Sequence, residues 1–313
     1  MKPLHMNTIK SLAIMKKTFL LSSLLFTLAA TAQNSNMFVV YSVKGTVSVI
    51  DNKVETKAKI GTILDGDETI KVGAGSFATI ICNETRAFSL NKAGNYSTAS
   101  LKDSCKISSG SVSSNYMKYV WTEMTKSKGT PEKNRRAYMA NVGAVTRDVN
   151  NVWIDTRLDT INYVSGTIPL SWKAYDPDIQ EFEFKLYDET ATNTLFSKTV
   201  RKKHVDIADI LKNIEVGKSY QWTAMVKGDP DNKVKKWLHY ASKEDYNKFY
   251  NSIKNSETAE TDAEKNFRIG FLLEEAHYLA EAYNHYLKAT QLDATNGLYR
   301  YTFMSFKKDY EIK

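Results

Sequence analysis

The residues best suited to catalysis or metal binding are few and widely spaced in this sequence. The chain of 313 residues contains five histidines and two cysteines, and it lacks the HExxH, GxSxG, CxxC and GxxxxGK[ST] patterns. His277 and His285 lie too far apart along one predicted helix to share a metal ion without further ligands. We therefore expect no catalytic residue, no cofactor and no metal site, and we interpret the protein as non-enzymatic.

Three acidic turns and one glycine pair are the remaining motifs that could bind a ligand. Asp65-Gly66-Asp67, Asp176-Pro177-Asp178 and Asp229-Pro230-Asp231 each lack the further spaced oxygens of a calcium loop. Gly73-Ala74-Gly75 separates two predicted strands, whereas a dinucleotide-binding motif joins a strand to a helix. We interpret all four segments as ordinary turns.

The two cysteines, Cys82 and Cys105, are a candidate disulfide. In an oxidising compartment, a bond closing a loop of about 23 residues would stabilise the fold by roughly 3 kcal/mol. The alternative is a pair of buried thiols.

The N-terminus has the pattern of a secretory signal. Lys16 and Lys17 precede the apolar run Phe19–Ala30, and Ala30-Thr31-Ala32 supplies the small residues that a signal peptidase accepts. The run is about 12 residues long, below the roughly 20 that span a bilayer, so a retained anchor is the weaker interpretation. We expect cleavage before Gln33, no stable membrane insertion afterwards, and a periplasmic location in a Gram-negative bacterium.

Composition and charge exclude several classes of protein. With 42% hydrophobic and 25% charged residues, the chain resembles soluble globular proteins rather than fibrous or disordered ones. Residues 1–32 contain four lysines and no acidic residue, so their removal lowers the formal charge from +8 to +4. This balance provides no basic stripe for nucleic acid. We interpret the short runs Arg201-Lys202-Lys203 and Lys233, Lys235 and Lys236 as solvated loops.

Short strand patterns follow one another from Met37 to Tyr96. Phe38–Val43 and Gly45–Ile50 end in turn formers, and Asp51-Asn52 suits a hairpin turn. The run Lys59–Ile80 contains a Gly, an apolar residue, Gly-Asp, an alternating strand, a further Gly and a second apolar strand. In this order of residues it resembles the FecR-type domain.

The FecR-like resemblance implies a periplasmic β domain. In that family the domain relays the occupancy of an outer-membrane receptor to a cytoplasmic regulator of a sigma factor. Family members carry a cytoplasmic segment and a membrane helix before the domain, whereas this chain has a predicted cleavable signal. We therefore do not expect the relay across the membrane here.

A helical linker is expected over residues 111–155. Its apolar stripe consists of Tyr116, Met117, Val120, Trp121 and Met124. The stripe has helical spacing and ends before Gly129-Thr130-Pro131. A second, more polar helix is expected over Glu132–Asn141. Such a stripe is typical of a packing surface.

Alternating strands return between about Asn162 and Gly228. Phe182, Phe184 and Leu186 are predicted to face one side of a sheet while charged neighbours face the other. Further predicted strands are Ile168–Trp172, Leu195–Val200 and His204–Ile207. The segment Ile214–Tyr220 matches the apolar-x-x-Gly-x-x-Tyr corner of fibronectin type III modules, which this region resembles. The resemblance implies a β-sandwich in which the Tyr220 hydroxyl bonds to the backbone of the preceding loop.

The C-terminal part is expected to be helical, and Asn266–Asn296 resembles one tetratricopeptide repeat. The matching residues are Ile269, Gly270, Leu273, Ala282, Tyr286 and Ala289. Small residues allow the two helices to approach closely, and Tyr286 is predicted to fill the space towards the next helix. Helices at about Lys243–Ile253 and Leu298–Phe306 are expected to cover the apolar faces that one repeat leaves exposed.

The repeat pattern places four residues on the side of the first helix that binds peptides in that family. These partner-binding candidates are Glu264, Phe267, Phe271 and Glu274. Phe267 and Phe271, at i and i+4, would form an aromatic ridge for a protein partner. The alternative is burial of the ridge under the helix that begins at Lys243.

The expected fold is α+β and multidomain, with an Ig/fibronectin-like β-sandwich between a FecR-like β domain and a helical hairpin. The expected segments are a signal peptide at 1–32 with an upstream extension at 1–14, the FecR-like domain at 33–110, the linker at 111–155, the sandwich at 156–240 and the repeat-like helices at 241–313. The expected function is protein–protein interaction or periplasmic signalling and assembly with partners of the cell envelope. The alternative is a glycan or peptidoglycan-binding module, because exposed Tyr and Trp rings stack on sugars.

Overall fold

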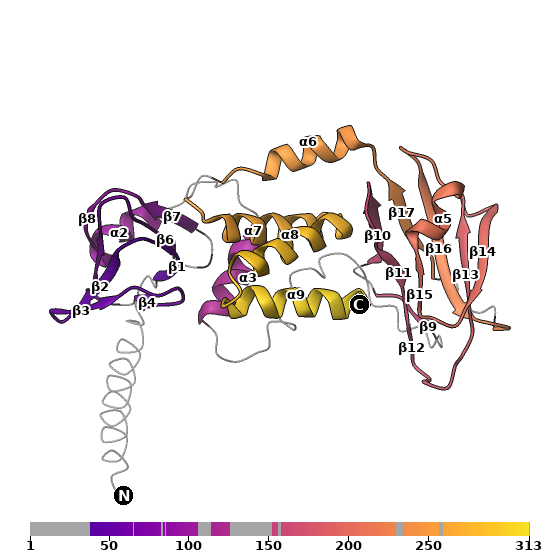
Figure 1. The fold of residues 1–313 in the computed structure, drawn as a ribbon, viewed down its shortest axis with the longest axis horizontal. Coiled ribbons are helices and arrows are strands. Elements are labelled where there is room, and N and C mark those ends of the chain that lie inside the picture. Colours follow the sequence, from indigo (N-terminus) through magenta and orange to yellow (C-terminus); the bar gives the residue numbers. More distant parts are fainter. Residues whose placement is uncertain are drawn as a thin grey trace, which may run out of the picture. The chain divides into compact units, whose positions relative to one another are not determined.

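The computed structural model describes residues 38–312 with several gaps. It does not describe residues 65, 83, 85, 106–113, 126–151, 156–157, 230–233 and 257–258. The described residues belong to one compact unit, Met37–Lys313, with an α+β fold (Figure 1). The predicted signal at 1–32, its extension at 1–14 and the predicted helix at Glu132–Asn141 lie outside the described residues.

The N-terminal region forms two four-stranded antiparallel sheets, in the strand orders β4-β1-β6-β7 and β3-β2-β5-β8. The strands are β1 (Phe38–Lys44), β2 (Val47–Asp51), β3 (Val54–Lys57), β4 (Ile63–Leu64), β5 (Thr69–Val72), β6 (Phe77–Cys82), β7 (Arg86–Leu90) and β8 (Gly94–Ser97). A short helix α2 (Thr98–Leu101) and a 3-10 turn η1 (Lys102–Cys105) follow. The quick succession of strands predicted for this region is therefore confirmed.

The predicted hairpin at Asp51-Asn52 is present, one residue further along the chain. Asp51 pairs with Val54 across the β2–β3 ladder, so Asn52 and Lys53 form the turn. Both turn residues have positive φ, 46° and 67°. This geometry matches the twist of the two strands, and Asn adopts it more readily than most residues.

Strand β1 is buried on both faces. Phe38 and Val40 point into the core that the two N-terminal sheets share. Val39 and Tyr41 point the other way and join a second core that contains the helices. Because successive side chains of a strand alternate, β1 connects the β region to the rest of the unit.

Cys82 of β6 and Cys105 of η1 form a disulfide, with their Cα atoms 5.9 Å apart. The bond ties the α2–η1 segment to the N-terminal sheet.

A second β region covers residues 152–240. Its main sheet has five strands in the order β10-β17-β16-β13-β14, all antiparallel except for the parallel pair β10–β17. The elements are β9 (Val152–Trp153), β10 (Thr160–Tyr163), β11 (Pro169–Ser171), β12 (Lys173–Ala174), β13 (Phe182–Tyr187), β14 (Thr194–Val200), β15 (His204–Asp206), α5 (Ile207–Ile210), η3 (Leu211–Asn213), β16 (Ser219–Val226) and β17 (Lys236–Tyr240). β11 pairs with β15, and β12 pairs with β9.

The alternation predicted for this sheet is confirmed. Phe182, Phe184 and Leu186 are fully buried while their neighbours on β13 are half-buried. Trp172, next to β11, packs on Phe182 with ring centroids 5.7 Å apart. The Tyr220 hydroxyl accepts a hydrogen bond of 2.7 Å from the backbone N–H of Glu215, as the predicted corner requires.

The interpretation of Lys236 as part of a solvated loop is wrong. Lys236 begins strand β17, and the residue is only 6% exposed. Its ammonium group lies 3.1 Å from Asp159 Oδ1. Arg201, in the other basic run, is exposed in the turn after β14.

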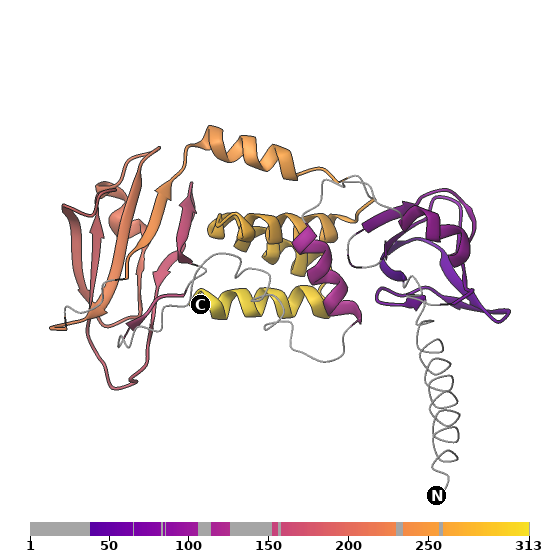
Figure 2. The same cartoon turned by 180° about the vertical axis from the view of Figure 1, so that it is seen from behind.

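Four helices complete the unit: α6 (Lys243–Ile253), α7 (Asp262–Glu275), α8 (Leu279–Leu292) and α9 (Gly297–Asp309). Figures 1 and 2 show α7, α8 and α9 side by side in a row with α9 at one end, and α8 contacts both of the others. The predicted helix pair and both flanking helices are present. An earlier helix, α3 (Ser114–Thr125), contains the predicted apolar stripe and contacts α7.

Gly270 and Tyr286 explain the close approach of α7 and α8. A Cβ atom at Gly270 would lie 3.0 Å from Cδ1 of Tyr286, so a larger residue there would displace the ring. The Tyr286 ring also packs against Phe306 of α9 at 5.4 Å. Tyr286 therefore fills the space towards the next helix, as predicted. His277, by contrast, lies in the α7–α8 turn with φ 61° and not on a helix with His285.

Candidate functional site

The predicted docking ridge of Phe267 and Phe271 is inside the protein. Both side chains are 0% exposed. Tyr116 of α3 packs against both rings, with centroids 6.3 and 5.4 Å away, and Tyr119 stacks on Phe271 at 5.2 Å. Tyr299 of α9 covers Phe267 at 4.6 Å. The prediction of an exposed partner-binding ridge is therefore wrong, because α3 and α9 cover it.

The alternative prediction, burial of the ridge, is confirmed, but the aromatic cover comes from α3 and α9 and not from α6 as expected. In α6, Tyr246 and Phe249 pack on Tyr278 at 5.3 and 5.5 Å, and Tyr250 stacks on His285 at 5.9 Å. Burial lowers the pKa of His285 from its ordinary value. Helix α3, expected as a linker, instead supplies the aromatic cover of α7.

The two candidate acids, Glu264 and Glu274, are also buried, each 2% exposed. Glu264 forms a capping box with Thr261, since its carboxylate accepts from the Thr261 N–H at 2.6 Å while its own N–H donates to the Thr261 hydroxyl. Glu274 accepts hydrogen bonds from the hydroxyls of Tyr286 and Tyr310 at 2.8 and 3.0 Å. Burial raises the pKa of Glu264. Both acids thus stabilise the helices internally and are not available to a peptide.

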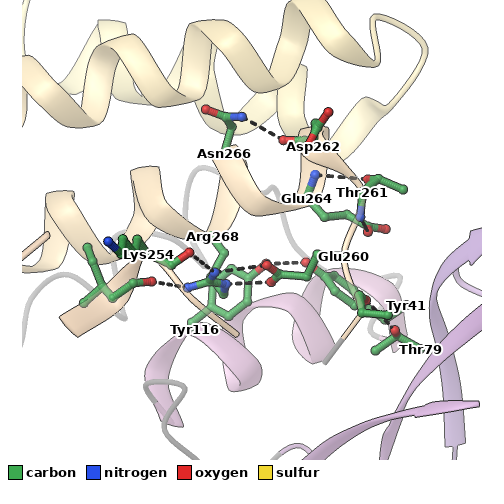
Figure 3. A network of polar contacts seen from close by, with 12 residues as sticks. Tyr41, Thr79, Tyr116, Lys254, Glu260, Thr261, Asp262, Glu264, Asn266 and Arg268 are labelled. Atoms are coloured by element: carbon green, nitrogen blue, oxygen red, sulfur yellow. Dashed lines mark hydrogen bonds and ion pairs between the residues drawn. The ribbon is translucent and has the colours of Figure 1, made fainter. Parts of the chain in front are cut away.

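A buried ion pair lies beside the N-terminal half of α7 (Figure 3). Arg268 donates to both carboxylate oxygens of Glu260, at 2.6 and 3.0 Å, and the two side chains are 2% and 7% exposed. Its third nitrogen donates to the Ile253 carbonyl at 2.6 Å, at the end of α6. The planar guanidinium suits such a forked arrangement, which fixes α6 and α7 relative to the segment between them.

The same region joins α7 to the N-terminal sheet. The hydroxyls of Tyr41 of β1 and Tyr116 of α3 are hydrogen-bonded to each other, and burial raises the pKa of both phenols well above the ordinary value. The Thr79 hydroxyl of β6 donates to the Ala259 carbonyl at 2.8 Å. We call Tyr41, Tyr116, Glu260, Glu264 and Arg268 the α7 junction. Tyr41 bonds to Tyr116, Arg268 bonds to Glu260, and Glu264 caps α7 through Thr261. These contacts come from β1, α3, α7 and the segment before α7, so the geometry supports a joining role.

Sequence reasoning missed Glu260 and Arg268. A signal was present, because Arg268 falls within the stripe of Glu264, Phe267, Phe271 and Glu274 at helical spacing. A charge in a stripe that becomes buried requires a partner of opposite charge. The identity of that partner depends on how the chain folds back before α7.

A row of one exposed and three half-buried side chains crosses the solvent face of the five-stranded sheet. Thr160, Trp237, Gln221 and Tyr187 are neighbours in register across β10, β17, β16 and β13. Trp237 is 37% exposed, and Tyr187 is half-buried beneath Lys235, whose ammonium lies 4.7 Å from the ring centroid. Two strand spacings, about 10 Å, separate the aromatic residues. We call these four residues the aromatic row.

A second exposed surface lies on α9. Gly297, Arg300, Tyr301, Met304 and Lys308 are all exposed, and we call them the α9 outer face. Tyr301 and Met304 are 58% and 60% exposed. The opposite side of α9 is buried against α7 and α8 through Tyr299 and Phe306. Neither the aromatic row nor this face was predicted residue by residue.

In the part of the chain that the structure describes, no group of three or more His, Cys, Asp or Glu side chains is placed to hold a metal ion. No helix within the described ranges is both long and apolar enough to cross a membrane.

Comparison with family models and curated proteins identifies no relative of this chain. No protein-family model matches the sequence, and no curated protein matches it.

Proposed function

We propose that this chain is a non-enzymatic protein of the cell envelope that docks other proteins, in assembly or in periplasmic signalling. The export pattern at 1–32 supports the location. The α9 outer face carries the proposal, because the solvent side of a surface helix is normally polar. Here Tyr301 and Met304 expose 58% and 60% of their surface at the centre of that side.

Local features support the finer fold assignments within this proposal. The paired antiparallel sheets at 38–97 are compatible with a FecR-like domain. The Tyr220 corner and the packing of Trp172 on the main sheet favour a fibronectin type III-like sandwich. The close contact of Gly270 with Tyr286 favours a tetratricopeptide-like hairpin.

Affinity capture from an envelope extract tests the docking function. The purified protein is the bait, and captured proteins are identified by mass spectrometry. We expect a partner whose yield falls when Tyr301 and Met304 are both replaced by Ser. Tyr175→Ser is the matched control, because Tyr175 is 68% exposed but lies outside α9, and it should leave the yield unchanged. Equal capture by all baits, or none by any, contradicts the proposal.

The aromatic row favours a second candidate function, binding of a glycan or peptidoglycan. Trp237 and Tyr187 lie on one flat face with the Gln221 amide between them. Rings spaced along a sheet can stack on successive sugars, while neighbouring polar groups bond to hydroxyls. Retention on purified cell wall that soluble glycan abolishes and Trp237→Ala weakens would support this function. Absence of retention by the wild-type protein would exclude it.

A further inference from the structure

The α9 outer face has the shape of a helix-packing surface. Its residues lie at i, i+3, i+4, i+7 and i+11, so they occupy an arc of about 100° over roughly 16 Å of helix. The Tyr301 ring lies over Gly297, with its Cε2 atom 3.5 Å from the position of a Cβ there. Because Gly297 has no side chain, the ring can lie close to the backbone of the preceding turn. Tyr301 and Met304 then form one ridge along the helix.

The other side of α9 shows how a helix packs onto this row. Tyr299 contacts Phe267 at 4.6 Å, and Phe303 contacts Tyr283 at 5.3 Å. Each helix of the row buries an aromatic ridge on its neighbour, as in stacked helical repeats. The α9 outer face carries the ridge of Tyr301 and Met304 at the end of the row, where stacked repeats normally present a polar surface. A further helix is therefore the occupant that matches the row.

The charges around the ridge are positive. Arg300 and Lys308 lie on the α9 outer face, and Lys307 lies beside it with its ammonium 5.9 Å from the Phe303 ring centroid. The five residues of the face include no acidic side chain. Complementary charge steers a partner and fixes its register, so the partner should carry Asp or Glu around its apolar residues.

Resting on the proposed docking function, we infer that the α9 outer face binds an acidic amphipathic helix of a partner protein. Apolar residues of that helix, spaced at i, i+3, i+4 and i+7, cover Tyr301 and Met304. Its carboxylates flank this contact and meet Arg300.

A second copy of the chain and a membrane surface fit the α9 outer face less well. An antiparallel pair of α9 helices centred on Met304 would oppose Arg300 of one copy to Lys308 of the other, and like charges disfavour that contact. Helices that lie on membranes bury a wide apolar face rich in Leu, Phe and Trp. Here the ridge consists of Tyr301 and Met304.

Fluorescence anisotropy with a defined probe tests the inference. The probe is a labelled, lactam-stabilised peptide of about 18 residues with Leu at i, i+3, i+4 and i+7 and Glu at the flanking positions. We expect saturable binding to the purified protein. Met304→Ser and Arg300→Glu should each weaken binding about tenfold or more, whereas Tyr175→Ser should not change it. A peptide with Lys in place of Glu should bind at least about tenfold more weakly.

Several results would overturn the inference. These are equal affinity for the acidic and basic peptides, or equal affinity of wild type and Met304→Ser. A dimer in light scattering that Met304→Ser dissociates would assign the face to a second copy. Sedimentation with phosphatidylglycerol vesicles that Met304→Ser abolishes, without peptide binding, would assign it to a membrane. If the peptide fails while envelope capture still depends on Tyr301 and Met304, the docking function stands and the acidic helix is wrong.

Discussion

Replacing Arg268 by Met should destabilise the protein because it leaves the charge of Glu260 buried. In the native state the Glu260 side chain is 7% exposed and receives two guanidinium hydrogen bonds, at 2.6 and 3.0 Å. Removing one partner of such a buried pair costs about 3–5 kcal/mol. The Ile253 carbonyl, now bonded at 2.6 Å, loses its donor in the same variant. We therefore expect the free energy of unfolding to fall by about 3–5 kcal/mol.

Urea unfolding followed by far-UV circular dichroism measures this loss, and a double-mutant cycle isolates its cause. Arg268→Met/Glu260→Leu contains neither buried charge, so it should be clearly more stable than Arg268→Met alone. Hydrogen exchange between Ile253 and Arg268 should rise in the single variant. A single variant within about 0.5 kcal/mol of wild type, or a double variant that recovers nothing, would refute the account of the α7 junction.

Four further predictions follow from burial and covalent structure. Phe271→Ala should cost about 3–5 kcal/mol of unfolding free energy and lower the melting temperature. Met304→Ser, at an exposed position, should change the unfolding free energy by less than about 0.5 kcal/mol, so equal effects would contradict the assignment of core and surface. Reduction of the Cys82–Cys105 disulfide should destabilise the N-terminal sheets by roughly 3 kcal/mol, measured by urea unfolding with and without reductant, and insensitivity to reductant would argue against this role. Glu281 of α8 is 9% exposed, and burial raises the pKa of its carboxyl group, although hydrogen bonds from its own backbone and from Ser165 partly oppose this shift. The protonated carboxyl group contributes its full stabilisation below pH 4.5, and this stabilisation is lost as the pH rises through the raised pKa of the folded state. At pH 8 the buried carboxylate is charged, whereas Gln stays neutral, so Glu281→Gln should unfold at a higher urea concentration than wild type. A lower midpoint for Glu281→Gln at pH 8 would reverse that conclusion.

Local patterns predicted the individual elements well. The helix expected at Lys243–Ile253 has those bounds, because Ser242 supplies an N-cap and accepts from the Asp245 N–H at 3.0 Å. The alternation of Phe182, Phe184 and Leu186 on β13 likewise depends on strand periodicity alone. Capping and periodicity involve neighbours in the sequence, so they can be interpreted without knowing the tertiary fold.

The partners of those elements could not be predicted in the same way. The stripe on α3 indicated a packing surface, but nothing local specifies that Tyr116 and Tyr119 cover Phe271 on α7. The prediction of an exposed ridge failed because the repeat pattern describes one helix pair and not what packs on it. The prediction for Lys236 was wrong for a related reason. Its basic run looks solvated in the sequence, but Lys236 begins a strand that pairs with β16, and its ammonium group pairs with Asp159.

The candidate surfaces depend on both the local sequence pattern and the tertiary packing. The spacing of Tyr301 and Met304 on a helix is visible in the sequence, yet their exposure follows from which side of α9 packs against α7 and α8. The aromatic row requires the register of four strands, and β17 was not among the predicted strands. Surfaces of this kind are therefore found from the structure, even when their residues are ordinary.

The most direct test of the docking function is photo-cross-linking in native cells with a benzophenone amino acid placed at position 304. Position 175, which is also open to solvent but lies in the bend after β12, is the control. The proposal predicts a specific adduct with another protein from position 304 and none from position 175. An adduct from position 175 with none from position 304, or no protein adduct from either, would contradict docking by the α9 outer face.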